Sequence, residues 1–99
     1  MLYAFISEDK VGTHRLRMEV RPAHLERLKK LQAAGKLVLA GPHPAIDNED
    51  PGEAGFTGSL VVADFPSLKA AQAWADDEPY LAAGVYASVN IKPFKKVLP

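Results

Sequence analysis

Residues 57–92, TGSLVVADFPSLKAAQAWADDEPYLAAGVYASVNIK, hold a strand, a helix and a second strand in succession. Residues 57–64 are a short apolar run rich in valine, which is typical of a strand. Residues 85–92 alternate apolar with polar side chains, the period of two that indicates a half-buried strand. Between the two strands, Ser67 is expected to be the N-cap of a helix that ends before Pro79. The stretch therefore predicts a β-α-β unit.

The residues upstream of this unit predict a similar set of elements. Residues 2–7, LYAFIS, are apolar and aromatic and predict the first strand. Arg21-Pro22 is expected to open a helix, because proline fits the first helical turn, and Gly35 to end it as a C′ glycine. Residues 37–41 predict another strand. Residues 8–20 and 42–56 are expected to be connecting loops.

Composition limits the kind of protein. The chain has 99 residues, the length of one domain, with 47% apolar and 24% charged residues. Twelve basic and twelve acidic residues leave no net charge, which argues against a nucleic-acid or anionic-membrane partner. Cysteine is absent, which excludes disulfides and a thiolate nucleophile. No segment approaches the roughly 20 apolar residues of a membrane span and no signal-peptide pattern is present, so we expect a cytoplasmic protein.

The predicted elements follow the order β-α-β-β-α-β. This order predicts a single ferredoxin-like α+β domain over residues 1–99, with an antiparallel sheet. Two helices of this length cover one face of a sheet, whereas the first and third strands are apolar on both faces. The second face therefore needs a partner, and a second copy of the chain is the simplest one. We predict a homodimer, or a higher assembly built on it, that buries the face bearing Tyr3 and Phe5.

Five runs, in order and over more than half of the chain, carry a family resemblance: VRPAHLERL (20–28), AGPHPAIDNEDPGEAGFTGS (40–59), AAQAWAD (70–76), PYLAAGVY (79–86) and KPFKK (92–96). They resemble the YciI family of YCII-related proteins. The resemblance implies a ferredoxin-like α/β barrel formed by dimerisation, with a pocket around a helix histidine and an acidic residue. It also implies small-molecule chemistry, since relatives with an assigned reaction include dehydrochlorinases and, by fold, muconolactone-isomerase-like enzymes.

The two site residues of the family map onto this sequence by position. The helix histidine corresponds to His24. The acidic residue, which in the family is an aspartate directly before a proline, corresponds to Glu78. Because glutamate is one methylene longer than aspartate, either Glu78 serves as the acid or a neighbouring aspartate such as Asp76 takes its place.

His24 also stands out from the residues alone. On a helical wheel it lies about 40° from Leu28 and about 20° from Leu31, within the apolar stripe of its helix. An imidazole in that stripe is either a structural group bonded to a backbone carbonyl or an acid/base group oriented by a carboxylate. Glu78 and Asp76 also have a non-functional interpretation. Carboxylates near the end of a helix are commonly solvated surface charges.

Four further residues are candidates for substrate binding. Arg17 and Arg21 precede the helix and would bind an anion such as a carboxylate, unless they are scattered surface charges. Gly41 and Ser59 lie at the two ends of the long loop, where glycine lets the backbone approach a ligand or form a bulge. The sequence has no nucleotide fingerprint and no familiar metal-ligand spacing, so we expect no cofactor and no metal.

Two functions follow from these residues. The first is a small-molecule enzyme in which His24, oriented by Glu78 or Asp76, transfers a proton during elimination, isomerisation or hydrolysis of a small anionic metabolite. The second is a non-catalytic dimeric module that binds a metabolite or a protein. An open pocket with His24 bonded to a carboxylate favours the enzyme, and a filled pocket favours the module.

Overall fold

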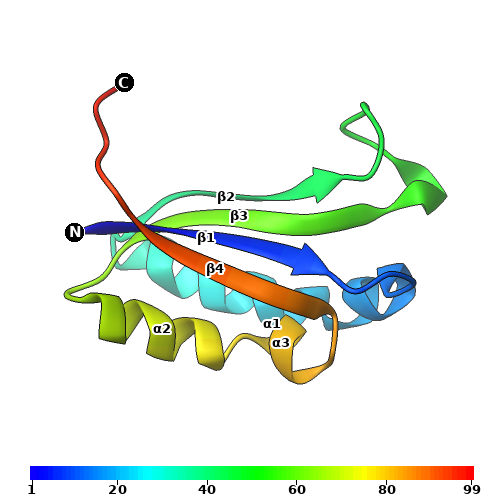
Figure 1. The fold of residues 1–99 in the computed structure, drawn as a ribbon, viewed down its shortest axis with the longest axis horizontal. Helices are drawn as coiled ribbons and strands as arrows, with labels where there is room; N and C mark the ends of the chain where they lie inside the picture. The colour runs from blue at the N-terminus through cyan, green and yellow to red at the C-terminus, as the bar shows by residue number, and fades with distance from the viewer.

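A four-stranded antiparallel sheet carries all of the helices on one face (Figure 1). The computed structural model describes residues 1–99. The elements run along the chain as β1 (Leu2–Asp9), α1 (His14–Ala33), β2 (Leu37–Pro44), a 3-10 turn (Gly52–Ala54), β3 (Phe56–Asp64), α2 (Leu68–Asp76), α3 (Pro79–Ala82) and β4 (Tyr86–Phe94). Their order in the sheet is β2-β3-β1-β4. This is the ferredoxin-like arrangement, which confirms the predicted fold class.

The core lies between the sheet and the helices. Tyr3 and Phe5 of β1 and Val61 of β3 pack there with Leu28 of α1. The ring of Phe5 also meets that of Trp74 edge-on, with 5.2 Å between centroids. The prediction that Tyr3 and Phe5 lie between two subunits is therefore wrong. Side chains alternate between the two faces along a strand, and the set of β1 side chains that includes Tyr3 and Phe5 points to the helices.

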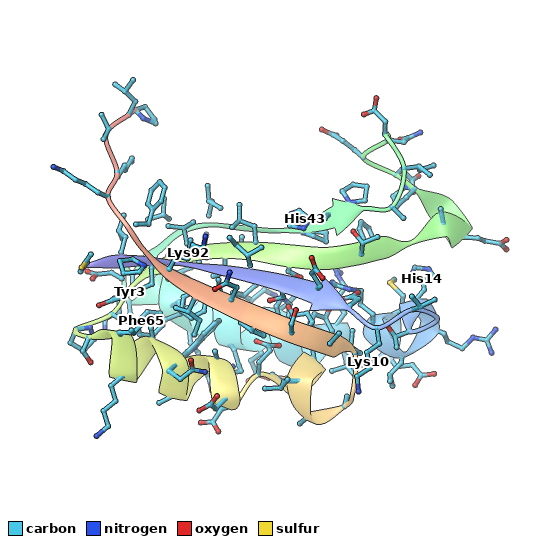
Figure 2. All side chains as sticks on the ribbon, viewed as in Figure 1. Tyr3, Lys10, His14, His43, Phe65 and Lys92 are labelled. Atoms are coloured by element: carbon cyan, nitrogen blue, oxygen red, sulfur yellow. The ribbon has the colours of Figure 1, made fainter.

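The opposite face of the sheet has no helix over it (Figure 1). Figure 2 shows His43 and Lys92 pointing away from the helices on this side. The same face presents Ile6, Leu39 and Phe94, all of which are exposed. The molecule thus has one face that its own helices cover and one open face with both apolar and polar side chains.

The first helix begins earlier than predicted. α1 starts at His14, so the predicted loop over residues 8–20 is wrong. Leu16 and Val20 pack against a small cluster of α3 and β4 residues, which extends the apolar stripe of the helix towards its N-terminus. Pro22 lies inside the helix, where it lacks an N–H to donate. The burial of Leu16 and Val20 outweighs the loss of the hydrogen bond that Pro22 cannot donate.

The predicted long loop is shorter than residues 42–56, because β2 continues to Pro44. Pro42 pairs with Ser59 across the sheet. β2 is an edge strand, where a residue without an N–H can sit without interrupting a ladder on both sides. The remaining connection, residues 45–55, projects beyond the sheet at the end where α1 begins (Figure 1).

Candidate functional site

His24 and Glu78 form a buried hydrogen-bonded pair beneath the sheet. Nδ1 of His24 lies 2.7 Å from Oε1 of Glu78, and only 9% and 4% of their side chains are exposed. His24 comes from the middle of α1, and Glu78 comes from the turn between α2 and α3. The other ring nitrogen of His24, Nε2, makes no hydrogen bond within the chain and is not sealed from solvent. The structure thus brings the predicted histidine together with one predicted carboxylate.

Several contacts fix the carboxylate of Glu78. The backbone N–H of Tyr80 donates to Oε1 at 3.3 Å, and Nη1 of Arg27 donates to Oε2 at 3.4 Å. Glu78 is therefore the N-cap of α3, and Pro79 lies in the first turn of that helix. An acidic residue followed by proline is a signal for the start of a helix. That signal would have predicted α3, which the sequence reasoning missed.

Asp76, the alternative carboxylate, lies apart from His24. It is the last residue of α2 and is exposed. Its Oδ1 accepts a hydrogen bond from Nε2 of Gln72 at 2.9 Å, one turn earlier on the same helix. The carboxylate that contacts His24 in the structure is that of Glu78.

The ring of Tyr80 fills the space between His24 and Arg17. It stacks on the imidazole of His24, with 4.3 Å between centroids and 24° between planes. The guanidinium carbon of Arg17 lies 4.6 Å from the centroid of the same ring. The two α1 residues are about two turns, or roughly 10 Å, apart, so the ring fits between them. The Tyr80 hydroxyl has no partner, and burial raises its pKa.

Arg17 belongs to a buried polar network. Its Nε and Nη2 donate to the carboxylate of Asp9 at 2.7 and 3.3 Å. Oγ of Ser59 accepts from Nη2 of Arg17 at 2.6 Å and from the Tyr86 hydroxyl at 3.1 Å. Burial by itself lowers the pKa of Arg17, but the hydrogen bond and charge of Asp9 outweigh it and raise the pKa overall. Burial also raises the pKa of Tyr86.

The space beside the His24–Glu78 pair is small. A cavity of about 10 Å³ adjoins the two side chains, and it is walled mainly by apolar residues of the sheet and α2. A cavity of this size has room for about one water molecule. This cavity is therefore too small for an organic substrate unless the structure moves.

A larger cleft of about 320 Å³ opens between α1, β2 and the 45–55 connection. Arg17 and Arg21 both line it. Ser59 is buried behind Arg17 in the polar network. Gly41 is exposed on the edge strand and does not line the cleft. Of the four predicted substrate-binding residues, only Arg17 and Arg21 therefore line the same cleft.

His14 is a residue of this region that the sequence reasoning missed. It lines the cleft and also an adjoining one of about 330 Å³. Its Nδ1 is buried without a hydrogen-bond partner and faces Gly55, where an added Cβ would lie 2.5 Å from that nitrogen. No spacing in the sequence singles out His14, because its neighbours come from a distant loop. Figure 2 shows its side chain at the first turn of α1.

Metal-ligating side chains do not gather in this chain. No group of three or more histidine, aspartate or glutamate side chains is close enough to hold a metal ion. Separately, none of the helices combines the length and the apolar character needed to cross a membrane.

Comparison with known proteins places these features in a family. The YCII-related domain model matches residues 1–95. Protein YciI of Escherichia coli O6:H1 is 60% identical over 97 residues, which cover 98% of this chain and 99% of that protein. A Haemophilus influenzae protein is 56% identical over 97 residues, with the same coverage of both chains. These matches confirm the resemblance seen in the sequence.

One solved structure shares the fold over nearly the whole chain. It is 5-chloro-2-hydroxyhydroquinone dehydrochlorinase (TftG) from Burkholderia phenoliruptrix AC1100, in complex with 2,5-dihydroxybenzoquinone. The TM-score is 0.84, with 24% identity, and the match covers 96% of this chain and 94% of that one. The similarity establishes a common fold.

Proposed function

The chain belongs to the YCII-related domain family, and from this premise we propose that it is a small-molecule enzyme whose acid/base group is His24. The observation that carries the proposal is the buried 2.7 Å contact between His24 and Glu78. A carboxylate bonded to one ring nitrogen orients the imidazole and stabilises the imidazolium that forms when the other nitrogen takes a proton. Such a pair is suited to proton transfer near neutral pH.

Each ring nitrogen of His24 has its own role in the proposed chemistry. When Nδ1 donates its proton to Glu78, the lone pair of Nε2 is free to act as a base. In an elimination, Nε2 takes a substrate proton, the electrons of that C–H bond form the new double bond, and the leaving group departs with its own electron pair. Isomerisation and hydrolysis need the same group, which accepts a proton in one step and returns it in another.

The fold similarity supports small-molecule chemistry as the general class. TftG is a dehydrochlorinase of a chlorinated hydroxyhydroquinone, so we place elimination first among the three reactions. The proposed substrate is small and anionic, with Arg21 as the exposed cationic group beside the cleft. We propose no cofactor, because the proton transfers above need only the side chains of this chain.

A second candidate function is a non-catalytic binding module. The observation that favours it is the cavity of about 10 Å³ beside His24 and Glu78, which leaves no room for a substrate. Under this alternative the pair is structural, and a ligand occupies only the outer cleft. The two functions differ in whether the region around His24 opens in solution.

We also propose that the protein is a cytoplasmic homodimer. The open face of the sheet, with Ile6, Leu39 and Phe94 exposed, replaces the face bearing Tyr3 and Phe5 as the proposed interface. Burying apolar surface of this kind contributes about 25 cal/mol per Å². Light scattering should give twice the chain mass, and a charge placed there by Leu39→Glu should shift the protein to monomer. A wild-type monomer at micromolar concentration would contradict this part of the proposal.

The enzymatic proposal is tested with three variants on a panel of small ring compounds, beginning with chloride release from 5-chloro-2-hydroxyhydroquinone. His24→Asn and Glu78→Gln should lower kcat/KM by about 10²–10⁴-fold, the usual contribution of a general base. Asp76→Asn is the matched control, because it removes a nearby carboxylate that does not contact His24. Thermal unfolding of each variant checks that it folds.

Each outcome separates the two functions. An activity that His24→Asn and Glu78→Gln abolish, while both proteins stay folded, supports the enzyme. An activity that survives in His24→Asn rules out His24 as the base. Ligand binding without turnover of any compound in the panel favours the binding module.

A further inference from the structure

The cleft beside α1 has its own set of polar groups, separate from the His24–Glu78 pair. Six of its lining residues bear on what it binds: His14, Arg17, Arg21, Pro42, Asp50 and Phe56. Its volume of about 320 Å³ lies within the range of small-molecule sites. The groups come from α1, β2, the 45–55 connection and the first residue of β3, which meet at one end of the sheet (Figure 1).

The two arginines of the cleft differ in how their charge is compensated. Arg17 is buried and paired with Asp9 through Nε and Nη2. Its Nη1 makes no hydrogen bond in the chain and is not sealed from solvent, so it is a fixed donor at the cleft. Arg21 lies one turn later, is exposed, and forms no ion pair. The cleft therefore has one cation without an ion-pair partner, Arg21, and one guanidinium nitrogen that is free to donate, Nη1 of Arg17.

His14 adds a third donor to the same space. Its Nδ1 is buried against Gly55 with no acceptor in reach. Nε2 of His14 makes no hydrogen bond in the chain and is not sealed from solvent, so it can donate to a ligand when the imidazole carries its proton there.

The remaining walls indicate the body of the ligand. The aromatic ring of Phe56 and the pyrrolidine of Pro42 add flat apolar surface to the lining of the cleft. Phe56 also lies 5.9 Å from the guanidinium carbon of Arg17, measured to its ring centroid. Asp50 lines the same cleft and its charge disfavours a second carboxylate on the ligand. A flat apolar molecule with a single negative charge matches this arrangement.

We propose that this cleft binds a small aromatic monocarboxylate, with the carboxylate held by Arg21 and Nη1 of Arg17 and the ring packed on Phe56. A guanidinium binds a planar carboxylate with directed, charge-assisted hydrogen bonds. The inference rests on the proposed function only in identifying the bound acid as the substrate class. The binding itself does not depend on catalysis by His24.

The probes are benzoate, benzyl alcohol and acetate, titrated into the folded protein and followed by amide NMR shifts. Benzoate should shift the resonances of Gly52 and Phe56 and saturate at about millimolar concentration. Benzyl alcohol lacks the charge and acetate lacks the ring, so each should bind at least about tenfold more weakly. Equal binding of benzyl alcohol, or no saturable shift with benzoate, would overturn the proposal.

Two arginine variants locate the charge. Arg21→Gln should weaken benzoate binding at least about tenfold. Arg15→Gln removes the same charge from an exposed position on α1 that does not line the cleft, and should leave binding unchanged. Equal losses in both variants would mean that benzoate responds to general charge, which overturns the assignment.

His24→Asn keeps the two proposals distinguishable. It should bind benzoate as the wild type does, whatever its activity. Retained activity in His24→Asn with intact benzoate binding would reject the proposed catalytic function and leave the binding site standing. Catalysis that needs His24 but ignores Arg21→Gln and benzoate would reject the identification of the bound acid as the substrate class and leave the catalytic function standing.

Discussion

His24 and His14, two histidines of the same helix, have opposite surroundings. His24 is bonded through Nδ1 to Glu78, beside a cavity of about 10 Å³. Nδ1 of His14 is buried without a partner, and the residue lines clefts of about 320 and 330 Å³. The middle of α1 thus has the bonded pair, and its N-terminal end has the open space. Under the proposed function, a substrate held in the cleft would have to reach Nε2 of His24 through local opening.

The largest effect is expected at the cleft end, where the buried Arg17–Asp9 pair holds the first turns of α1 against β1. Asp9→Asn leaves the guanidinium of Arg17 buried and unpaired, which should lower the free energy of unfolding by about 3–5 kcal/mol. The matched control is Asp64→Asn, which removes an exposed ion pair with the N-terminus and should cost at most about 1 kcal/mol. Urea unfolding measures both. Similar small losses would mean that the cleft end does not depend on this pair.

A smaller effect on stability distinguishes two neighbouring buried tyrosines, Tyr80 and Tyr86. The Tyr86 hydroxyl donates to Ser59, so Tyr86→Phe should lower the free energy of unfolding by about 1 kcal/mol. The Tyr80 hydroxyl has no partner, so Tyr80→Phe should leave stability unchanged or raise it. The same urea experiment compares them. A clear loss of stability in Tyr80→Phe would show that its hydroxyl is bonded in solution.

Features that depend on neighbouring residues were predictable from the sequence. Ser67 accepts a hydrogen bond from the N–H of Ala70, as an N-cap should. Gly35 follows the C-cap of α1 with a φ of 72°, the left-handed conformation that a C′ glycine adopts. The alternation within residues 85–92 likewise predicted β4, although its bounds shift to Tyr86–Phe94. Local rules of capping and periodicity were enough for the β-α-β-β-α-β order, although they left α3 unpredicted.

Features that depend on distant residues were not predictable in this way. Pro22 suggested a helix start, but contacts of Leu16 and Val20 with α3 and β4 carry α1 back to His14. Asp9 was placed in a loop, because only the folded chain brings it to Arg17. The cleft was not predictable either, since its walls come from four separate segments of the chain. The histidine and its acid were found by family position together with the helical stripe.

The most direct test of the account is the tautomer of each histidine. Long-range proton–nitrogen NMR at about pH 8, above the usual histidine pKa, distinguishes a proton on Nδ1 from one on Nε2. We expect the Nδ1–H form for His24, because Glu78 accepts that proton, whereas at His14 no hydrogen bond of Nδ1 favours either form. Glu78→Gln should weaken the Nδ1 preference at His24 and leave His14 unchanged. An Nε2–H tautomer at His24 in the wild type would contradict the account, since the nitrogen proposed as the base would then hold the proton.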